Sequence, residues 1–370
     1  DNKSITLDED VNNRLVNWKI PTNEFTDQKK VTLRHLLSHS SGLADGYGFK
    51  GYAPDEGIPD LLSILNAMRP ANNKKRLTIE TVPGSIERYS GGGYIIIQQL
   101  LEDVTRVPFY QFVDSVVFKP FGMMHSTYND YPDNSHYNNI AVAHHDNGKA
   151  YMFDYKIYPE NAATGFWTTA TDLARLIIGI QRIEKGQSNL LNSKLITEML
   201  TPQINSMGLG VHLKGDRTVN GFWHAGNNEG FTGILMATIP TGQGAVVLTN
   251  SNRGEWLAME ILRSVAKTYD WPITLSFRPL PIPNAAELCG LYVETADKKL
   301  EINKEKGRLY FTRNGNKKKF YIYQTAKDQF RIAEKPDNLL FIFKRNETGQ
   351  VTGLAMYENA GSSHIFLSKK

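Results

Sequence analysis

A tyrosine in this 370-residue chain lies in a setting that could support acid–base chemistry. Tyr89 is followed by Ser90 and then by Gly91-Gly92-Gly93, so we expect its phenol on a glycine-rich turn that opens a helix. Glycine at such a turn lets a substrate approach the backbone closely. A turn tyrosine is also commonly a packing residue, so this segment alone does not establish an activity.

A histidine further along the chain is the second candidate. His224 ends an extended segment and is followed by Ala225 and Gly226 before a strand. A glycine at this place allows a ligand to lie along a strand edge. The backbone N–H of Asn227 could then face an oxyanion. This motif is also weak when it is taken alone.

The order of these motifs resembles that in class C β-lactamases, DD-peptidases and related esterases. The segments that carry the resemblance span most of residues 7–270 and are Thr32 to Leu43, Pro83 to Gly91, Lys119 to Met123, Gly165 to Ala174 and Trp223 to Phe231. The resemblance implies an α+β, β-lactamase/transpeptidase-like domain with an antiparallel sheet flanked by helices. It also implies that a serine in a Ser-x-x-Lys motif forms an acyl-enzyme.

The resemblance also implies roles for individual residues. Tyr89 matches the proton-shuttling tyrosine, and His224 occupies a position where lysine is usual. The implied substrate-binding residues are Ser90, Gly91, Ala225, Gly226, Asn227 and Trp167. Trp167 could equally pack in the core. Gly91 replaces an asparagine, so one side-chain contact to the substrate is lost. A histidine carries little fixed charge at neutral pH, which favours esters, peptides or D-amino-acid amides over penicillins.

The nucleophilic serine of the family is missing from its expected place. In the family, Ser-x-x-Lys precedes the segment that Leu7 to Val11 resembles. The Ser-x-x-Lys of this chain, Ser264 to Lys267, follows His224 and is therefore in the wrong order. We interpret Ser264 as a surface or packing residue, because Leu257, Ile261 and Val265 share one face of its predicted helix.

Two hypotheses explain the missing serine. The chain is a truncated or processed form whose upstream part holds the serine, or it is a relative that naturally lacks a nucleophile. We favour truncation, because Tyr89 and His224 have no shared catalytic role without the serine. In either case we expect this chain to be inactive in acyl transfer as it stands.

The helices and strands that must position these residues follow from periodicity, caps and turns. Predicted helices are 31–37 with Thr32 as N-cap, 60–68, 94–104, 109–117 closed by Pro120, 168–184 with the Thr-x-x-Asp start Thr169 to Asp172, and 255–269, with a further helix start at 7–11. Predicted strands 232–239 and 245–250 flank the turn 240–244, so we expect them to pair antiparallel.

A second, all-β domain is predicted beyond a proline-rich linker. Residues 279–283 form the linker, so the hydrolase-like domain is expected over 1–278 and the second domain over 284–370. Eight short strands are predicted near 290–294, 299–303, 308–313, 319–325, 329–333, 339–345, 351–358 and 364–368. Their spacing favours a small meander barrel, lipocalin-like in outline, or a sandwich.

Composition excludes several classes of partner. Apolar content of 41% and charged content of 22% are typical of a globular protein. The net charge of +4 is concentrated beyond residue 284, where 16 Lys and Arg face 10 Asp and Glu. Lys317 to Lys319 is too short a run for nucleic-acid binding and is interpreted as a solvated hairpin. The single cysteine, Cys289, cannot form an internal disulfide and is expected in the core.

No cofactor, metal or transmembrane segment is predicted. His35 and His39 are four residues apart on a predicted helix, but no third metal ligand is evident, so packing is favoured. His144-His145-Asp146 is interpreted as a loop. No run of about 18 apolar residues occurs. Residues 1–10 show no signal peptide, and the resemblance implies a periplasmic or other extracytoplasmic location.

Three functions therefore remain open. The first is a serine hydrolase of small-molecule or peptide esters and amides. The second is a DD-peptidase or D-aminopeptidase that acts on cell-wall-type peptides. The third is a silent protein that recognises acyl-D-amino-acid ligands without catalysis.

Overall fold

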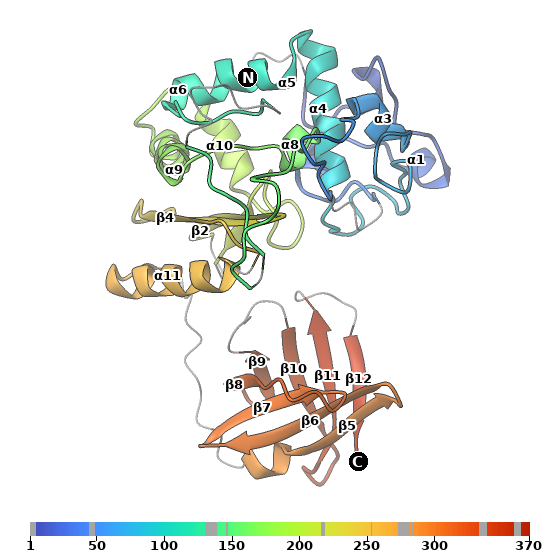
Figure 1. The fold of residues 1–370 in the computed structure, drawn as a ribbon, viewed down its shortest axis with the longest axis vertical. Helices are drawn as coiled ribbons and strands as arrows, with labels where there is room; N and C mark the ends of the chain where they lie inside the picture. Colours follow the sequence, from blue (N-terminus) through green and yellow to red (C-terminus); the bar gives the residue numbers. More distant parts are fainter. Residues whose placement is uncertain are drawn as a thin grey trace. The chain divides into compact units, whose positions relative to one another are not determined.

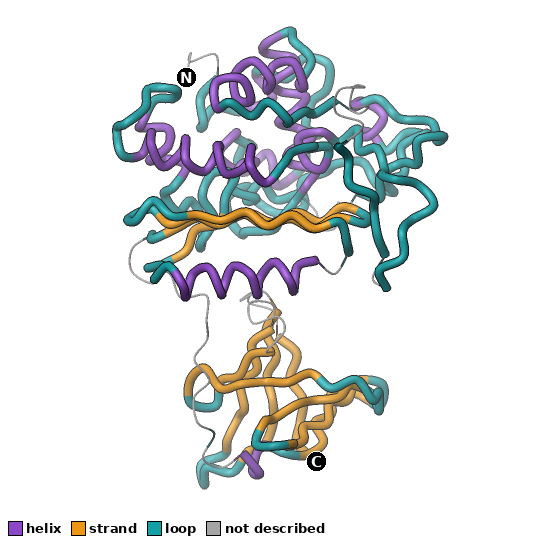
Figure 2. Tube along the Cα trace, turned by 60° about the vertical axis from the view of Figure 1, so that its left-hand side comes forward, coloured by secondary structure: helices purple, strands orange, loops and turns teal. Residues whose placement is uncertain are grey.

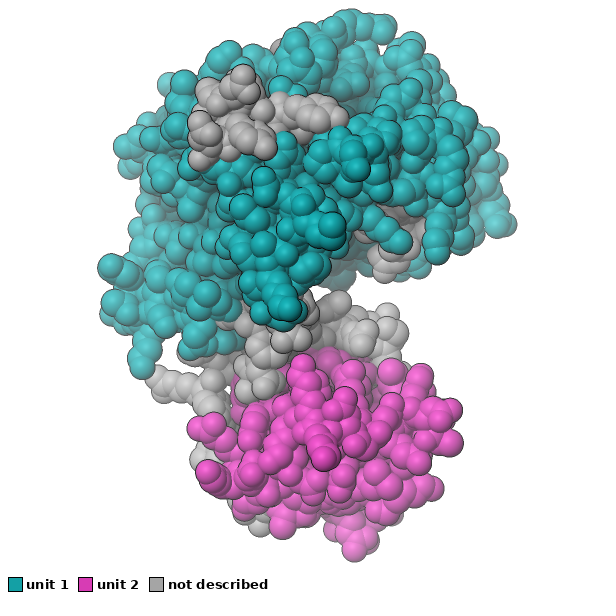
Figure 3. Space-filling view, in the orientation of Figure 1, with its two compact units in different colours: residues 1–273 teal, residues 274–370 magenta. Residues whose placement is uncertain are grey.

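The computed structural model describes residues 5–43, 49–129, 139–145, 147–215, 219–252, 254–272, 282, 285–332, 339–358 and 364–370. The chain divides into two compact units, residues 1–273 and residues 274–370, which have separate colours in Figure 3. Each unit has hydrophobic core clusters of its own. The linker expected at 279–283 lies outside the described residues, apart from Ile282.

The first unit contains a four-stranded antiparallel sheet with the order β1-β2-β3-β4. Its strands are β1 (His212–Lys214), β2 (Gly221–Asn228), β3 (Phe231–Thr238) and β4 (Gly244–Thr249). The expected antiparallel pairing of β3 with β4 is confirmed. Beside the turn between β2 and β3, Asn228 pairs with Phe231, and this register fixes which residues of β2 face each edge.

Helices cover both faces of this sheet (Figures 1 and 2). Helix α11 (Gly254–Thr268) packs on β3 and β4 from one side, and α9 (Ala170–Glu184) packs on β4 from the other. The other helices described are η1 (Val11–Asn13), α1 (Glu24–Gln28), α2 (Leu33–Leu37), α3 (Leu61–Asn66), α4 (Gly91–Thr105), α5 (Phe109–Val113), η2 (Asp114–Phe118), α6 (Lys119–Phe121), α8 (Asn161–Thr164) and α10 (Ser193–Met199). Within the described ranges, none has the length and apolar character needed to cross a bilayer.

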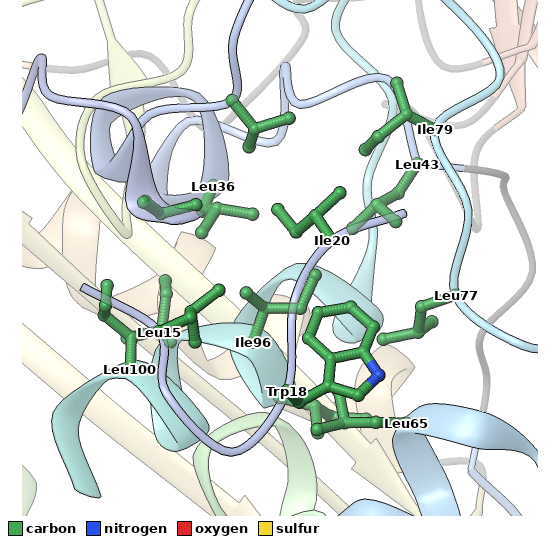
Figure 4. Close-up of a cluster of buried hydrophobic side chains, with 14 of the residues drawn as sticks. Leu15, Trp18, Ile20, Leu36, Leu43, Leu65, Leu77, Ile79, Ile96 and Leu100 are labelled. Carbon is green, nitrogen blue, oxygen red and sulfur yellow. The ribbon is translucent and has the colours of Figure 1, made fainter. Parts of the chain in front are cut away.

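Helix α4 is at the centre of a core that also includes α2, α3 and the N-terminal segment (Figure 4). Ile96 and Leu100 of α4 are buried there with Leu36 of α2. The expected N-cap of α2 is confirmed, because the Thr32 hydroxyl accepts the backbone N–H of His35. The start of α4 is therefore held by a dense apolar cluster.

The start of helix α9 holds two neighbouring segments in place through hydrogen bonds of Thr169 and Asp172. Its predicted Thr-x-x-Asp start is confirmed, since the Thr169 hydroxyl accepts the N–H of Asp172 at 3.2 Å. The buried Asp172 carboxylate accepts the backbone N–H of His125 at 2.7 Å and the Ser126 hydroxyl at 2.9 Å. These bonds join two segments that are distant in the sequence, and they anchor the backbone just beyond Trp167.

Two predicted helix boundaries were wrong. Residues 7–9 form bends rather than a helix, and the N–H of Arg34 bonds to the C=O of Leu7 instead of a helical donor. The short helix η1 follows, with Asp10 as its cap. The helix predicted at 109–117 continues through η2 and α6. Pro120 does not end it, because this residue lies in the first turn of α6, where a missing N–H costs little.

The second unit is a closed antiparallel barrel, so of the two predicted architectures, barrel and sandwich, the barrel is confirmed. Its strands are β5 (Gly290–Thr295), β6 (Lys298–Glu305), β7 (Arg308–Arg313), β8 (Phe320–Ala326), β9 (Gln329–Ile332), β10 (Leu339–Arg345), β11 (Val351–Glu358) and β12 (His364–Lys369), preceded by η3 (Ala285–Leu288). Phe311, Phe330 and Phe341 fill its interior. Cys289 is only half-buried, at the margin of this core.

We predict that Asp103 of α4 is a main anchor of the first unit. Its buried carboxylate accepts the N–H groups of Val16 at 2.7 Å and Asn17 at 3.3 Å, and the side-chain amides of Asn17 and Gln99. Asp103→Ala leaves these donors without an acceptor, so unfolding should become easier by about 3 kcal/mol. Urea denaturation followed by tryptophan fluorescence measures this, because all five tryptophans lie within residues 1–273.

Asp55→Ala is the matched control, because Asp55 is exposed. Its unfolding midpoint should stay at the wild-type value. Equal midpoints for the two variants would contradict the anchor role of Asp103.

Candidate active site

Tyr89 lies immediately before α4. The Ser90 hydroxyl accepts the N–H of Gly93 at 3.3 Å and so caps this helix. Gly91 to Gly93 form the first helical turn rather than a separate loop. A Cβ on Gly93 would lie 3.6 Å from the Leu36 carbonyl oxygen and 3.7 Å from the Leu36 side chain, which are ordinary contact distances. Packing against α2 therefore does not by itself require glycine at position 93.

A buried histidine contacts Tyr89 from the segment after α2. The ring of His39 lies 4.1 Å from the Tyr89 ring, measured between centroids. The Nδ1 atom of His39 accepts the N–H of Ser90 at 3.1 Å. His39 is not on the helix with His35, because α2 ends at Leu37 and His39 has a φ of 52°. The two histidines therefore do not form the helical metal face considered from the sequence.

His224 lies on β2 where one edge of the strand becomes open. Strand β1 pairs with residues 221–223 and reaches no further along β2. Asn228 and Phe231 flank a two-residue turn, so they should form a hydrogen-bonded pair. In an antiparallel ladder every second residue bonds to the same neighbour, so Gly226 and His224 should also bond toward β3. By this alternation the backbone groups of Ala225 and Asn227 face away from β3, toward the open edge.

The face of the sheet is also open at Gly226. A Cβ placed on this residue would meet no atom of the described residues within 4 Å. The turn itself is held from outside the sheet, because the Asn228 amide donates to the Thr164 carbonyl at 2.8 Å. The N–H of Glu229 likewise donates to the Tyr158 hydroxyl at 2.9 Å. The edge is thus open but rigidly supported.

Histidines near Tyr89 are held in the neutral form. Burial, with a smaller contribution from His212, lowers the pKa of His224 to about 4. Burial also lowers the pKa of His212, against the opposing effect of Glu87. The rings of His212 and His224 lie 6.1 Å apart, and those of His212 and Tyr89 lie 6.5 Å apart. Burial raises the pKa of the Tyr89 phenol, so this group holds its proton at neutral pH.

A cavity of about 1010 Å³ brings most of the predicted site residues together. Seven of the eight line it: Tyr89, Gly91, Trp167, His224, Ala225, Gly226 and Asn227. Ser90 does not, because its side chain is buried and caps α4. The apolar wall includes Leu173, Ile177 and Ile180 of α9 with Phe222 and Ile234 of the sheet.

The lining holds little fixed charge. Lys156 is the one Lys or Arg among the described lining residues. Its ammonium group pairs with the Glu229 carboxylate at 2.5 Å and donates to the Lys50 carbonyl at 3.0 Å. The cavity therefore offers a substrate carboxylate no unpaired lysine or arginine within the described part of the chain.

Nucleophilic side chains in the described lining are limited to threonine and tyrosine hydroxyls, with neither serine nor cysteine present. Ser264 is exposed on α11, on the opposite side of the sheet from α9, and is outside the lining. Leu257, Ile261 and Val265 do share a face of α11, but Leu257 and Ile261 are exposed there. The face that α11 buries carries Ala258, Leu262 and Ala266 instead.

Two neighbours of the site were not recognised from the sequence. His39 was considered only with His35, and His212 was not considered at all. The polar run of Ser38, Ser40 and Ser41 around His39 was the available signal for the first. The structure shows that these residues are buried. The second had none, because its proximity to Tyr89 arises from the pairing of β1 with Trp223 of β2. The described residues form no cluster of three or more His, Cys, Asp or Glu suited to a metal ion, and Asp146 lies outside them.

An antiparallel sheet between helical layers, with a tyrosine and a histidine on one cavity, defines an α+β fold of the penicillin-recognising type. The Beta-lactamase family model matches residues 1–269, and the chain belongs to that family. A putative D-alanyl-D-alanine carboxypeptidase of Salmonella typhi is 20% identical over 258 residues, which are 62% of this chain and 59% of the relative. The corresponding protein of Salmonella heidelberg is 23% identical over 110 residues, 30% of this chain and 24% of the relative.

Solved structures show the same fold. A penicillin-binding protein homologue from Pyrococcus abyssi, described as octameric, aligns with a TM-score of 0.56 at 16% identity, covering 99% of this chain and 83% of that chain. A penicillin-binding protein from Bacillus halodurans aligns with a TM-score of 0.54 at 21% identity, covering 71% and 78%. The chain spans less than two thirds of the length of the curated relatives named above.

The low pKa values of the buried histidines predict a specific acid sensitivity. Burial lowers the pKa of His35 and of His224 to about 4 and that of His39 to about 3, from an ordinary 6.5. Between pH 6.5 and 4 the unfolded chain therefore binds protons that the folded chain does not. The free energy of unfolding should therefore decrease as the pH is lowered through this window, by up to about 1.4 kcal/mol per pH unit for each histidine.

Urea denaturation at pH 7, 6 and 5 measures this dependence. Burial lowers the pKa of His212 as well, so His39→Asn removes one of several such groups and should make the decline shallower. A free energy of unfolding that stays constant from pH 6.5 to 5 would contradict the prediction.

Proposed function

We propose that the first unit provides the acid–base and oxyanion parts of a serine hydrolase site that acts on esters or amides through an acyl-enzyme. The supporting observation is that Tyr89, His224 and the open β2 edge at Asn227 line one cavity. The proposed mechanism uses no metal or organic cofactor.

In the proposed reaction, a serine hydroxyl loses its proton to a neighbouring base as its oxygen attacks the carbonyl carbon. The N–H of Asn227 donates to the oxyanion that forms. The bond from the carbonyl carbon to the leaving group then breaks as the Tyr89 phenol protonates that group, and the base returns the serine proton to Tyr89, so that the serine ester remains. Water attacks this acyl-enzyme by the same route in reverse and regenerates the serine.

We further propose that the serine comes from a helical segment that the described residues do not include. The support for this proposal is that the described cavity lining holds neither serine nor cysteine, although Tyr89 and His224 both line it.

The electrostatics favour a substrate that is uncharged where it meets His224. The imidazole is neutral at pH 7, and Lys156 is already paired with Glu229. Small-molecule or peptide esters and amides are therefore the proposed substrates. A D-Ala-D-Ala-type peptidase is the second candidate, supported by the name of the Salmonella typhi relative. A silent recognition protein is the third, supported by the lack of a serine in the described lining.

We predict that the 370-residue chain alone shows no acyl transfer. Incubation with p-nitrophenyl esters and with a fluorescent penicillin should release no nitrophenol and leave the intact mass unchanged. The control is the same protein expressed with all the coding sequence that precedes Asp1 in its gene. An acyl adduct on Ser264, or on any other serine of the 370 residues, would overturn the proposal.

The longer protein separates the three candidates. Penicillin labelling favours the peptidase, and ester turnover without labelling favours the esterase. Neither signal in the longer protein favours the silent recognition protein. A gene whose reading frame starts at Asp1 would remove the basis for a missing upstream serine.

We predict opposite effects of two substitutions in the hydrolytically active form. Tyr89→Phe removes the shuttled proton and should lower kcat by about 10²–10⁴-fold with little change in KM. His224→Lys introduces a fixed positive charge and should speed the reaction with carboxylate-bearing substrates relative to neutral esters. Steady-state kinetics on a matched pair, one ester with and one without a carboxylate, measure both effects.

His145→Lys is the matched control for the charge, because His145 is exposed and lies outside the cavity lining. An equal change of substrate preference in both lysine variants would contradict the role proposed for His224.

We also propose an extracytoplasmic location, supported by the family and by the carboxypeptidase name of the curated relative. Fractionation of the producing cells tests it, with cytoplasmic recovery as the contrary result.

A further inference from the structure

His39 contacts both residues that flank Tyr89. Its backbone carbonyl accepts the N–H of Arg88 at 2.7 Å. Its Nδ1 atom accepts the N–H of Ser90 at 3.1 Å. One residue, 50 positions away in the sequence, thus holds the backbone on each side of the proposed proton shuttle.

The imidazole ring makes the third contact. Its centroid lies 4.1 Å from that of Tyr89 and 5.2 Å from that of Tyr94 on α4. Tyr94 is itself tied to α2, because its hydroxyl donates to the Leu37 carbonyl at 3.2 Å. His39 therefore packs between Tyr89 of the site and Tyr94 of the core. The contact with Tyr94 fixes the imidazole ring against which Tyr89 packs.

The backbone of His39 is compatible with these contacts. Its φ of 52° is in the left-handed region, where histidine is enriched together with asparagine and aspartate among residues other than glycine. The residue is also only 2% exposed. In this conformation the carbonyl and the ring both reach the 88–90 segment.

The protonation state of His39 follows from its bonds. Because Nδ1 accepts a hydrogen bond, the ring proton of the neutral form is on Nε2. That buried atom has no hydrogen-bond partner among the described residues. Burial and the nearby imidazoles of His224 and His212 lower the pKa of His39 to about 3. The acceptor is therefore retained over the whole working range of pH.

We propose that His39 is a positioning residue that fixes the Tyr89 phenol at the mouth of the cavity through two backbone bonds and one ring contact. The functional meaning of this position rests on the proposed function, in which Tyr89 transfers the proton. The contacts themselves do not, so the test below needs no turnover.

Two variants of the 370-residue chain separate the contacts. His39→Asn tolerates the left-handed backbone and keeps an oxygen that can accept from Ser90, but it removes the ring. His39→Phe keeps a ring and removes the acceptor. His35→Phe is the matched control, because the buried His35 also has an Nδ1 that accepts a backbone N–H, that of Thr32 at 3.2 Å. His35→Phe should thus destabilise α2, the helix that precedes His39, without touching Tyr89.

Two NMR measurements follow the outcome. Amide hydrogen exchange reports on the Ser90 N–H, and the ring-carbon signal of ¹³C-labelled tyrosine, assigned with Tyr89→Phe, reports the phenol pKa. In His39→Phe the Ser90 amide should exchange roughly three- to tenfold faster. Burial raises the phenol pKa of Tyr89, so release of the segment should move that pKa down toward its ordinary value.

The remaining variants decide between positioning and general packing. His39→Asn should retain protection at Ser90, and His35→Phe should leave both signals of the 88–90 segment at their wild-type values. The inference fails if His39→Phe leaves the Tyr89 titration unchanged, or if His35→Phe changes it equally. A fixed Tyr89 in a protein that hydrolyses nothing would overturn the proposed function alone.

Discussion

The hydrogen bond from the Ser90 N–H to the Nδ1 atom of His39 joins two segments on which the site depends. Ser90 starts α4, whose apolar side chains lie at the centre of a core of the first unit. His39 follows α2, which packs on α4. Because Tyr89 precedes Ser90 directly, the packing of the two helices sets the place of the phenol. Stability and positioning therefore have the same origin here.

Desolvation determines the chemistry available beside that phenol. His39 and His224 are kept neutral chiefly by burial, and the one lysine in the described cavity lining is neutralised by Glu229. A neutral imidazole can donate one hydrogen bond and accept another but supplies no fixed charge. The site is thus suited to moving protons and to binding through the β2 edge, whereas attraction of an anion would need another group.

Local signals predicted much of the architecture. The caps at Thr32 and Thr169 and the spacing of the barrel strands were readable, because each depends on neighbours a few residues away. The bends at 7–9 were not. The helix at 109–117 was predicted, but its continuation to Phe121 was not, since it depends on a change to π-helical spacing. Tyr89 and His224 were found through the order of motifs, but His212 approaches Tyr89 only through strand pairing.

The apolar wall of the cavity limits what can complete the site. Ile177 and Ile180 of α9 also belong to a buried core cluster with Phe222, so the same side chains serve the core and the lining. These side chains are already shielded from water, since Phe222 is 1% exposed, Ile177 3% and Ile180 8%. The wall therefore needs no further segment to cover it, and what the described lining lacks is a serine near Tyr89 and Asn227.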